Sequence, residues 1–288
     1  MAQANGIGKP EQKTMGGDKV QQLFGDKNGL LVKQTRRGCR QECLGCEAKS
    51  EYKISAMEWN LIYDDYKVSE EGKQQQDIMY ALEKSNYCCR RCWRDGRPFN
   101  MKVSEGGEPG GAEVLQYIKP CSFPLYFSIP TQNGSIDCPC CCLLPKLSTS
   151  SANGTPLENQ SKYICDINLA VPKLQYLEKG NPVYILKPET CCGGCCIVCN
   201  PCTGKGFVYL PFYFHDPSIG SVIGGDYSGK ETPQISKLWA GLGKECCSTA
   251  DTFAVMFPPG IDAKRKAGLL GLTFLLDFTI FERQQQKS

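Results

Sequence analysis

One apolar run, Ala267–Phe281 (AGLLGLTFLLDFTIF), constrains the fold of this 288-residue chain more than any other segment. As a helix the run would be about 22 Å long, which is short of the roughly 30 Å hydrocarbon core of a bilayer. Asp277 within the run would add about 2.5–3.5 kcal/mol near a bilayer centre. Because a helix that is apolar on all sides has to be enclosed, we expect a buried core helix with Asp262 as its N-cap.

Most of the remaining chain has the pattern of short strands. Alternating apolar segments are separated by Gly, Pro, Asn and Cys, which indicates an antiparallel barrel or sandwich. We therefore expect a mostly β fold, an antiparallel β-barrel enclosing the C-terminal helix. The expected strands include Leu30–Val32, Glu51–Ile54, Ile78–Leu82, Phe99–Val103, Val114–Ile118, Tyr163–Leu169, Pro182–Leu186, Phe207–Phe214 and Thr252–Phe257.

Polar segments without periodicity are expected to lie outside this core. Residues 1–28 are rich in Gly, Gln and Lys and are predicted to be a flexible tail, as are residues 284–288. Residues 29–283 form the predicted domain. Tyr63–Gln76 and Ser148–Ser161 are two polar stretches within it that we expect to be surface loops.

Charge and motifs argue against several functions. The chain has 33 Lys+Arg against 30 Asp+Glu, and a net charge of +3 is too small for a dedicated nucleic-acid binder. His215 is the single histidine, and the sequence has no P-loop, G-x-S-x-G or H-E-x-x-H motif, so we expect no covalent catalysis. The N-terminus shows no apolar region typical of a secretory signal, which predicts a cytosol-facing chain with reduced thiols.

The chain contains 20 cysteines, most of them in tight clusters. In one interpretation, pairs with C-x-x-C spacing hold a tetrahedral zinc ion, and the candidate ligands are Cys192, Cys195, Cys196 and Cys199. In another, neighbouring thiols carry acyl chains at a membrane surface, where stable anchoring takes two signals. The acylation candidates are Cys138, Cys140, Cys141 and Cys142. A third interpretation is plain packing of small apolar residues.

Basic residues accompany some of these clusters. Arg90, Arg91 and Arg94 surround Cys92, and Lys264, Arg265 and Lys266 precede the apolar run. Each Lys or Arg near an anionic leaflet is worth about 1 kcal/mol, so these residues are candidates to face a membrane of anionic phospholipid. The alternative is that these basic residues lie on ordinary solvent-exposed surface with no role at a membrane.

Several motifs together resemble the phospholipid scramblase family. They are ISKLWAG (235–241), ADTFAVMFP (250–258), the KRKA segment before the apolar helix, CCRRCWRDGRPF (88–99), CPCCC (138–142) and CCGGCCIVC (191–199). The resemblance covers roughly residues 29–283. It implies a tubby-like β-barrel closed around a hydrophobic helix, palmitoylation in the CPCCC run, and association with the cytoplasmic face of membranes. It also implies Ca²⁺-dependent movement of phospholipids between leaflets in both directions.

The calcium segment departs from the family pattern. The acidic first and last positions of that loop fall on Thr249 and Gly260, which leaves Asp251 inside the window and Asp262 just outside it. A Ca²⁺ site takes 6–8 oxygen ligands, several of them carboxylates. We therefore expect at most a weak calcium site at these two aspartates, and calcium control is doubtful.

Two function hypotheses follow. In the first, the protein is an acylated, membrane-bound member of the scramblase family that moves lipids without covalent chemistry. In the second, the same fold is a structural or interaction module within a larger membrane or cytoskeletal protein assembly. The second is favoured by the lost calcium acids and by Trp59–Asp77, which is an insertion relative to the family pattern. Zinc would stabilise a variant of either.

Overall fold

The structure is a computed structural model of the chain. It describes residues 15–35, 49–58, 74–93, 96–122, 126–131, 134–139, 144–164, 171–191, 196–197, 210–224, 232–238 and 251–281. The predicted C-terminal tail, residues 284–288, and most of the predicted loop Tyr63–Gln76 lie outside these ranges.

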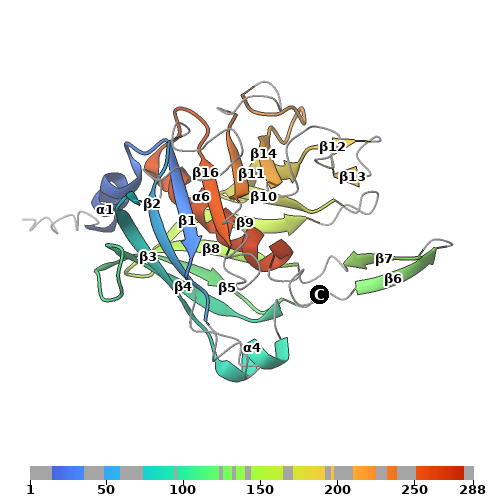
Figure 1. The fold of residues 1–288 in the computed structure, drawn as a ribbon, viewed down its shortest axis with the longest axis horizontal. Helices are drawn as coiled ribbons and strands as arrows, with labels where there is room; N and C mark the ends of the chain where they lie inside the picture. Colours follow the sequence, from blue (N-terminus) through green and yellow to red (C-terminus); the bar gives the residue numbers. More distant parts are fainter. Residues whose placement is uncertain are drawn as a thin grey trace, which may run out of the picture.

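Twelve strands form a closed barrel in the order β1-β16-β15-β14-β11-β10-β9-β8-β5-β4-β3-β2 (Figure 1). Strand β1 pairs with β16 on one side and with β2 on the other, and all the pairings around the barrel are antiparallel. The strands are β1 (Gly29–Gln34), β2 (Glu51–Ala56), β3 (Asp77–Lys84), β4 (Phe99–Glu105), β5 (Glu113–Lys119), β8 (Lys146–Ser151), β9 (Pro156–Ile164), β10 (Lys173–Glu178), β11 (Asn181–Pro188), β14 (Leu210–His215), β15 (Gln234–Leu238) and β16 (Thr252–Met256).

The barrel encloses the C-terminal helix. Helix α6 (Ala263–Leu276) continues as a π-helical segment, η6 (Asp277–Phe281), and every residue from Lys266 to Phe281 is buried. Asp262 is the N-cap, and its side chain accepts a hydrogen bond of 2.7 Å from the backbone N–H of Arg265. The predicted fold, a mostly β barrel around an apolar C-terminal helix, is confirmed. Within the described ranges no helix combines the length and apolar character needed to cross a membrane.

The strands supply the inner surface that this helix needs. In β4, Phe99, Met101 and Val103 are buried and alternate with partly exposed polar residues, so one face of the strand lines the core. Burying side chains of this kind contributes about 1.5–3 kcal/mol each. The interior of the barrel is therefore a packed apolar core around α6.

The prediction that residues 1–28 form a flexible tail is wrong over part of this range. Helix α1 (Met15–Phe24) lies within residues 1–28, and it packs against α6 through buried Val20 and Phe24. Lys266 of α6 donates hydrogen bonds from Nζ to the carbonyls of Gly25 (2.9 Å) and Lys27 (2.8 Å) just beyond the helix. Carbonyls at a helix C-terminus lack hydrogen-bond partners within the helix, so the ammonium group of Lys266 stabilises the C-terminal end of α1.

The predicted surface loop Ser148–Ser161 is also wrong. These residues belong to β8, to β9 and to the short turn between them, where Gly154 has φ 82°. The stretch is rich in Ser, Thr and Asn, but a barrel strand needs apolar or uncharged residues only at alternate positions. Buried Leu147 and Thr149 supply two of these positions in β8.

Smaller elements lie outside the barrel. Two ribbons are formed by β6 (Tyr126–Thr131) with β7 (Gly134–Pro139), and by β12 (Thr190–Cys191) with β13 (Cys196–Ile197). Helix α4 (Tyr87–Trp93) follows β3. Figure 1 shows the β6–β7 ribbon projecting well beyond the barrel wall.

Two glycines allow α6 to approach the barrel closely. A Cβ atom on Gly268 would lie 2.6 Å from the hydroxyl of Tyr176, and one on Gly271 would lie 2.7 Å from the ring of Tyr117. Both tyrosine side chains are fully buried, so neither ring has free space to move into. Tyr117 also donates a hydrogen bond of 2.7 Å to the Ala267 carbonyl, which fixes its ring beside the helix.

We predict that Gly271→Ala destabilises the protein although alanine is the better helix former. The added methyl overpacks the core against Tyr117, at a cost of about 1–3 kcal/mol, and this outweighs a helix-propensity gain of about 1 kcal/mol. Chemical denaturation measures the change. Lys264→Ala, on an exposed position of the same helix, is the control and should leave stability nearly unchanged. Equal or greater stability of Gly271→Ala would contradict the close packing.

Candidate functional site

Cysteine is confined to the connections at one end of the barrel. Successive strands along the chain are neighbours and antiparallel, so successive connections alternate between the two ends. All 20 cysteines fall in the connections that share one end, which we call the thiol end. These connections are residues 35–50, 85–98, 120–145, 165–172, 189–209 and 239–251. The intervening connections, at what we call the opposite end, contain no cysteine in their sequence.

Helix α6 runs from the opposite end to the thiol end. Near its start, Asn159 at the beginning of β9 donates a hydrogen bond of 2.8 Å to the Lys264 carbonyl. Near its finish, Tyr52 at the beginning of β2 donates one of 2.6 Å to the carboxylate of Asp277. The negative end of the helix dipole therefore lies at the thiol end.

Three cations gather around this end of the helix, of which Arg97 and Lys119 are buried and Lys237 is partly exposed. The guanidinium of Arg97 lies 4.8 Å from the ring centroid of Phe278, and the ammonium of Lys237 lies 4.6 Å from that of Phe281. Lys119 is 1% exposed and donates hydrogen bonds of 3.0 Å to the Arg97 carbonyl and to Ser122 Oγ. These cations complement the helix C-terminus and close the thiol end of the core.

A buried ion pair holds Arg97 in place. Its Nε and a terminal nitrogen donate to the two carboxylate oxygens of Glu83 at 2.9 and 3.2 Å, and Glu83 is fully buried. Ser50 adds a backbone hydrogen bond of 2.9 Å to the same carboxylate. Burial alone would raise the pKa of Glu83, but the charge and hydrogen bonds of Arg97, with those from Ser85 and Ser50, hold this pKa below its ordinary value.

The described thiols of this end are accessible. Cys88 in α4 and Cys121 after β5 are exposed free cysteines, and Cys89 is partly exposed. Two large apolar side chains nearby in the sequence are also exposed, Tyr87 at 46% and Ile118 at 45%. The thiol end therefore combines reachable thiols with apolar surface, which suits attachment to an apolar phase.

The structure covers the predicted cysteine sites only in part. Cys138 lies in β7 and Cys196 in β13, where Cys196 pairs with Cys191 in the strand register. The remaining acylation candidates, Cys140, Cys141 and Cys142, lie outside the described residues. So do the remaining zinc candidates, Cys192, Cys195 and Cys199. Both assignments stay predictions.

The predicted membrane-facing basic residues do not form one surface. Arg90 is 7% exposed and Lys266 is 8% exposed, so burial makes this prediction wrong for both residues. Arg265 forms an ion pair with Glu178 at 2.6 Å, which leaves Lys264 as the exposed member of its cluster. Arg91 is described only through the backbone of α4, and Arg94 lies outside the described residues.

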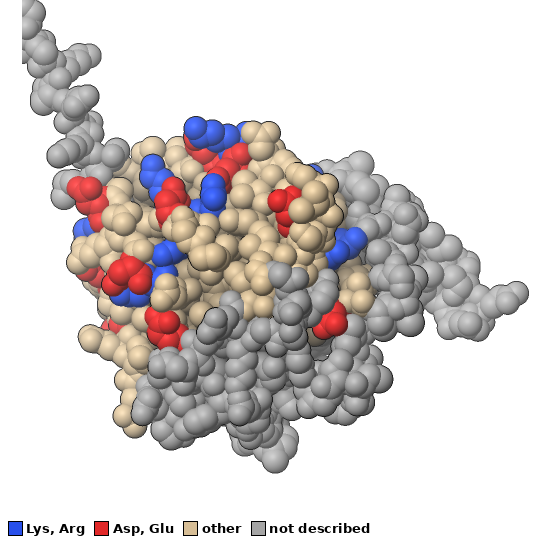
Figure 2. Space-filling model, turned by 90° about the horizontal axis from the view of Figure 1, so that it is seen from above, with Lys and Arg blue, Asp and Glu red and all other residues tan. Residues whose placement is uncertain are grey.

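The two basic clusters also lie at different ends of the barrel. The Lys264–Lys266 cluster begins α6 at the opposite end, whereas α4 lies at the thiol end. Elsewhere on the surface, lysines are paired with acids, as in Lys53–Glu108 and Lys102–Glu113. Figure 2 shows the two signs of charge interspersed among the described residues of one face.

The predicted calcium ligands Asp251 and Asp262 do not come together. Asp251 is 5% exposed and bonds Lys237 Nζ at 2.7 Å, whereas Asp262 caps α6. The length of β16 separates them, roughly 16 Å at 3.3 Å per residue, while ligands of one Ca²⁺ lie 2.3–2.6 Å from the ion. Among the described residues, no three or more His, Cys, Asp or Glu side chains are grouped to hold a metal ion.

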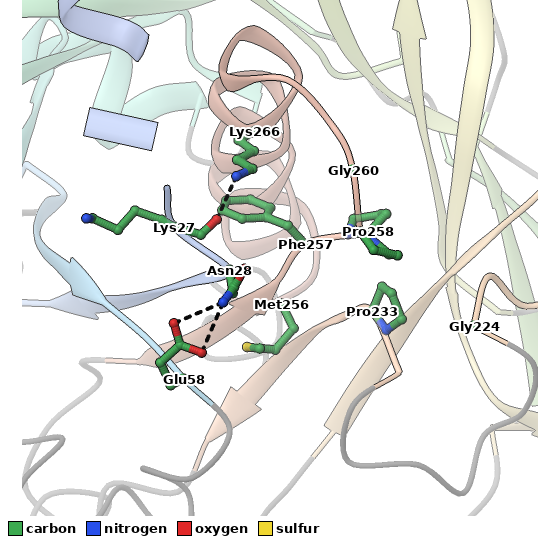
Figure 3. A pocket seen from close by; sticks show the side chains of 11 residues that line it. Lys27, Asn28, Glu58, Gly224, Pro233, Met256, Phe257, Pro258, Gly260 and Lys266 are labelled. Atoms are coloured by element: carbon green, nitrogen blue, oxygen red, sulfur yellow. Dashed lines mark hydrogen bonds between the residues drawn. The ribbon is translucent and has the colours of Figure 1, made fainter. Parts of the chain in front are cut away.

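A cavity of about 850 Å³ lies at the opposite end (Figure 3). It is bounded by the end of β16, the start of β1 and the start of α6, with Met256, Phe257 and Pro258 among its apolar lining residues. Asn28 donates to Glu58 at 3.3 Å across its wall, and Lys266 is bonded to the Lys27 carbonyl. The ammonium of Lys27, also in this wall, bonds the carboxylate of Asp26 outside it at 2.8 Å.

The sequence interpretation missed β6, β7 and the exposed thiol Cys121, and it placed Cys88 in a cysteine cluster without naming it as an attachment candidate. Asn133-Gly134 stands between two alternating segments, and this dipeptide is the strongest short-range hairpin signal in a sequence. The burial of Arg90 and Lys266 had no comparable local signal, because their environment is made by distant parts of the chain.

A twelve-strand antiparallel barrel filled by its own C-terminal helix, with its thiols at one end, defines the class of protein. The Scramblase family model matches residues 225–283. The chain is 30% identical to human phospholipid scramblase 1 over 220 residues, which cover 74% of this chain and 56% of that protein. It is 30% identical to human phospholipid scramblase 2 over 210 residues (72% and 58%) and 29% identical to mouse phospholipid scramblase 1 over 225 residues (74% and 55%).

The chain belongs to the phospholipid scramblase family, as its motifs predict. It spans a little over half the length of the curated relatives named above. No solved structure matches it.

We predict that Glu83→Gln lowers the free energy of unfolding by about 3–5 kcal/mol near neutral pH, because it leaves the buried Arg97 without its counter-charge. The pKa of Glu83 is below 4.5 in the folded protein and returns to about 4.5 on unfolding. Its stabilising effect is therefore present above about pH 4.5 and is lost as the pH falls through the folded pKa.

Denaturant unfolding at a series of pH values tests this prediction. The stability difference between the unsubstituted protein and Glu83→Gln should narrow as the medium is acidified below the ordinary glutamate pKa. Glu113→Gln removes a partly exposed pair with Lys102 and is the control, with an expected change of about 0–1 kcal/mol. A difference that stays constant on acidification would show that the charge of Glu83 does not stabilise the fold.

Proposed function

We propose that this protein is a membrane-surface member of the scramblase family whose thiol end faces the bilayer. In this proposal it promotes the movement of phospholipids between leaflets in both directions and performs no covalent chemistry. The observation that carries the proposal is the confinement of all 20 cysteines to the connections at one end of the barrel. A single membrane-facing end allows several attachment points to act on the same surface.

The proposed attachment is S-acylation of Cys138, Cys140, Cys141 and Cys142 on the cytoplasmic face of a membrane. A single acyl chain binds a bilayer only marginally, so neighbouring thiols suit stable anchoring better than isolated ones. The exposed thiols Cys88 and Cys121 at the same end support the accessibility of this surface. Zinc bound by Cys192, Cys195, Cys196 and Cys199 is the competing proposal for the cysteine-rich segments.

Phospholipid would have to move along the outside of this protein. The barrel interior is filled by α6, whose residues from Lys266 to Phe281 are all buried, together with the strand side chains that pack on it. The described residues therefore line no polar route for a lipid headgroup through the barrel. The proposed activity works by attachment to the bilayer and perturbation of its surface.

The filled interior also favours a second candidate function, in which the fold is an interaction module within a larger membrane or cytoskeletal assembly. A barrel whose described interior is filled presents its outer surface to partners. Recovery of a stable complex after salt washing of native membranes would support this function. Recovery of the protein alone after detergent extraction would count against it.

We predict that the full chain, reconstituted into vesicles with a fluorescent phospholipid, accelerates the exposure of inner-leaflet lipid to a membrane-impermeant quencher. The measurement is made with and without added Ca²⁺, and we expect little dependence on Ca²⁺ because Asp251 and Asp262 lie apart. Protein-free vesicles, and vesicles with heat-unfolded protein, are the controls. If lipid exposure is not accelerated at any Ca²⁺ concentration, the proposed lipid-moving activity is excluded and the interaction module remains as the candidate function.

We predict hydroxylamine-sensitive acyl groups on the Cys138–Cys142 segment of protein isolated from its native membranes. Acyl-exchange mass spectrometry locates these groups, and metal analysis of the same sample measures zinc. Replacing the four candidate cysteines with serine should shift the protein from the membrane to the soluble fraction, whereas Cys165→Ser, at a single thiol of the same end, should not. Unmodified thiols together with about one zinc ion per chain would favour zinc binding over acylation as the role of the cysteine-rich segments.

A further inference from the structure

The cavity at the opposite end has an apolar floor and an exposed rim (Figure 3). The floor is made by the buried residues Pro233, Met256, Phe257 and Pro258. The rim includes the exposed Pro259 and the exposed, hydrogen-bonded pair Asn28 and Glu58. Small-molecule sites occupy about 300–1,000 Å³ and combine mostly apolar walls with a few polar groups. At about 850 Å³, the cavity has the size and the lining of such a site.

One buried cation reaches this cavity from α6. Lys266 lines the cavity and is 8% exposed. Its ammonium donates to the carbonyls of Gly25 at 2.9 Å and Lys27 at 2.8 Å, and it lies 5.9 Å from the ring centroid of Phe257. A lysine ammonium has three donors, and among the described residues no acceptor meets the third. The cavity therefore has one hydrogen-bond donor to offer a ligand, and this donor is charged.

The positive charge of Lys266 is not neutralised by an ion pair. No carboxylate of the described residues lies within ion-pair distance of its ammonium, because Asp26 bonds Lys27 and Glu58 bonds Asn28. Burial lowers the pKa of Lys266, and the attraction of the Asp26 carboxylate offsets this lowering only in part. A buried cation is stabilised by a nearby anion more than an exposed one is, since less water screens the pair. The floor of the cavity is therefore complementary to an anion.

We propose that this cavity binds a small amphiphilic anion, an apolar body that carries one carboxylate or phosphate group. The anionic group accepts a hydrogen bond from the ammonium of Lys266, and the apolar body packs on Met256, Phe257 and Pro258. Glu58 carries the one negative charge among the described lining residues, so the anionic group lies on the Lys266 side of the cavity, away from this carboxylate. The site lies at the end of the barrel away from the proposed membrane attachment, and its existence does not depend on the proposed function.

Titration calorimetry of the full chain with decanoate and with decanamide tests the site. Both probes carry the same apolar chain and are used at concentrations at which they are monomeric. Decanoate should bind about tenfold more tightly or better, because a hydrogen bond from an ammonium to a carboxylate is stronger than one to a neutral amide. Decyl phosphate in a parallel titration distinguishes the two head groups, and the tighter binder of the two identifies the anion that the site takes.

Replacement of the cation should remove this preference. Lys266→Met keeps an apolar side chain of similar length, and the ratio of decanoate to decanamide affinity should fall to about one. Lys264→Met, at an exposed position of the same helix, is the matched control and should keep the ratio of the unsubstituted protein. Thermal unfolding of both variants shows whether α1, whose C-terminal end Lys266 supports, remains in place.

A second pair of variants leaves Lys266 and its carbonyl partners unchanged. Pro259 is exposed at the rim, so Pro259→Glu and Pro259→Gln differ by one charge beside the site. Pro259→Glu should bind decanoate about threefold more weakly than Pro259→Gln does, since like charges repel across the cavity. Decanamide should bind equally to the two variants.

Three outcomes would overturn the site. They are equal binding of decanoate and decanamide to the unsubstituted protein, a preference for decanoate that survives in folded Lys266→Met, and no binding of any of the three probes. If the unsubstituted protein self-associates and the probes neither bind nor disturb the association, while Pro259→Glu and Pro259→Gln both abolish it, the cavity is covered by a second copy of the chain. Failure of the vesicle experiments under the proposed function leaves this site unaffected, and failure of the probe titrations leaves the proposed function unaffected.

Discussion

The enclosure of α6 by the barrel is the interaction on which the rest of the structure depends. A helix without a polar face has no stable position in water, so twelve strands close around it and their alternate side chains form its surroundings. The fit is close enough that Gly268 and Gly271 face tyrosine side chains with no room for a methyl group. Two polar contacts also tie the helix to the strands, since Tyr52 bonds Asp277 and Tyr117 bonds the Ala267 carbonyl.

The direction of this helix gives the two ends of the barrel different chemistry. Its C-terminus lies at the thiol end, together with the buried cations Arg97 and Lys119 and the partly exposed Lys237. Its N-terminus lies at the opposite end, where Lys266 bonds carbonyls that follow α1. Arg90, near cysteines in the sequence, and Lys266, just before the apolar run, are thus buried at the two different ends of the barrel. Proximity in sequence to a candidate attachment site did not predict their exposure.

The parts of the fold predicted from sequence are those with a local signal. The apolar run at Ala267–Phe281, the cap at Asp262 and the alternation in β4 each follow from the residues themselves. Helix α1 did not, because its apolar residues Val20 and Phe24 acquire a partner only when α6 is in place. The serine-rich strands β8 and β9 could not be predicted from their own residues either. A strand in a closed barrel is stabilised by pairing with its neighbours more than by its own β propensity.

The candidate site was predictable in its residue types and not in its geometry. The cysteine clusters indicated attachment or metal binding, but only the alternation of strand connections shows that the clusters share one end. That arrangement bears on the proposed mechanism, because an end that carries the proposed attachment points would act on lipid from the surface of a bilayer. The described residues fill the barrel interior and line no polar channel there, so in the proposed function the effect on lipid exchange comes from the packing disturbance that surface attachment creates in the leaflet.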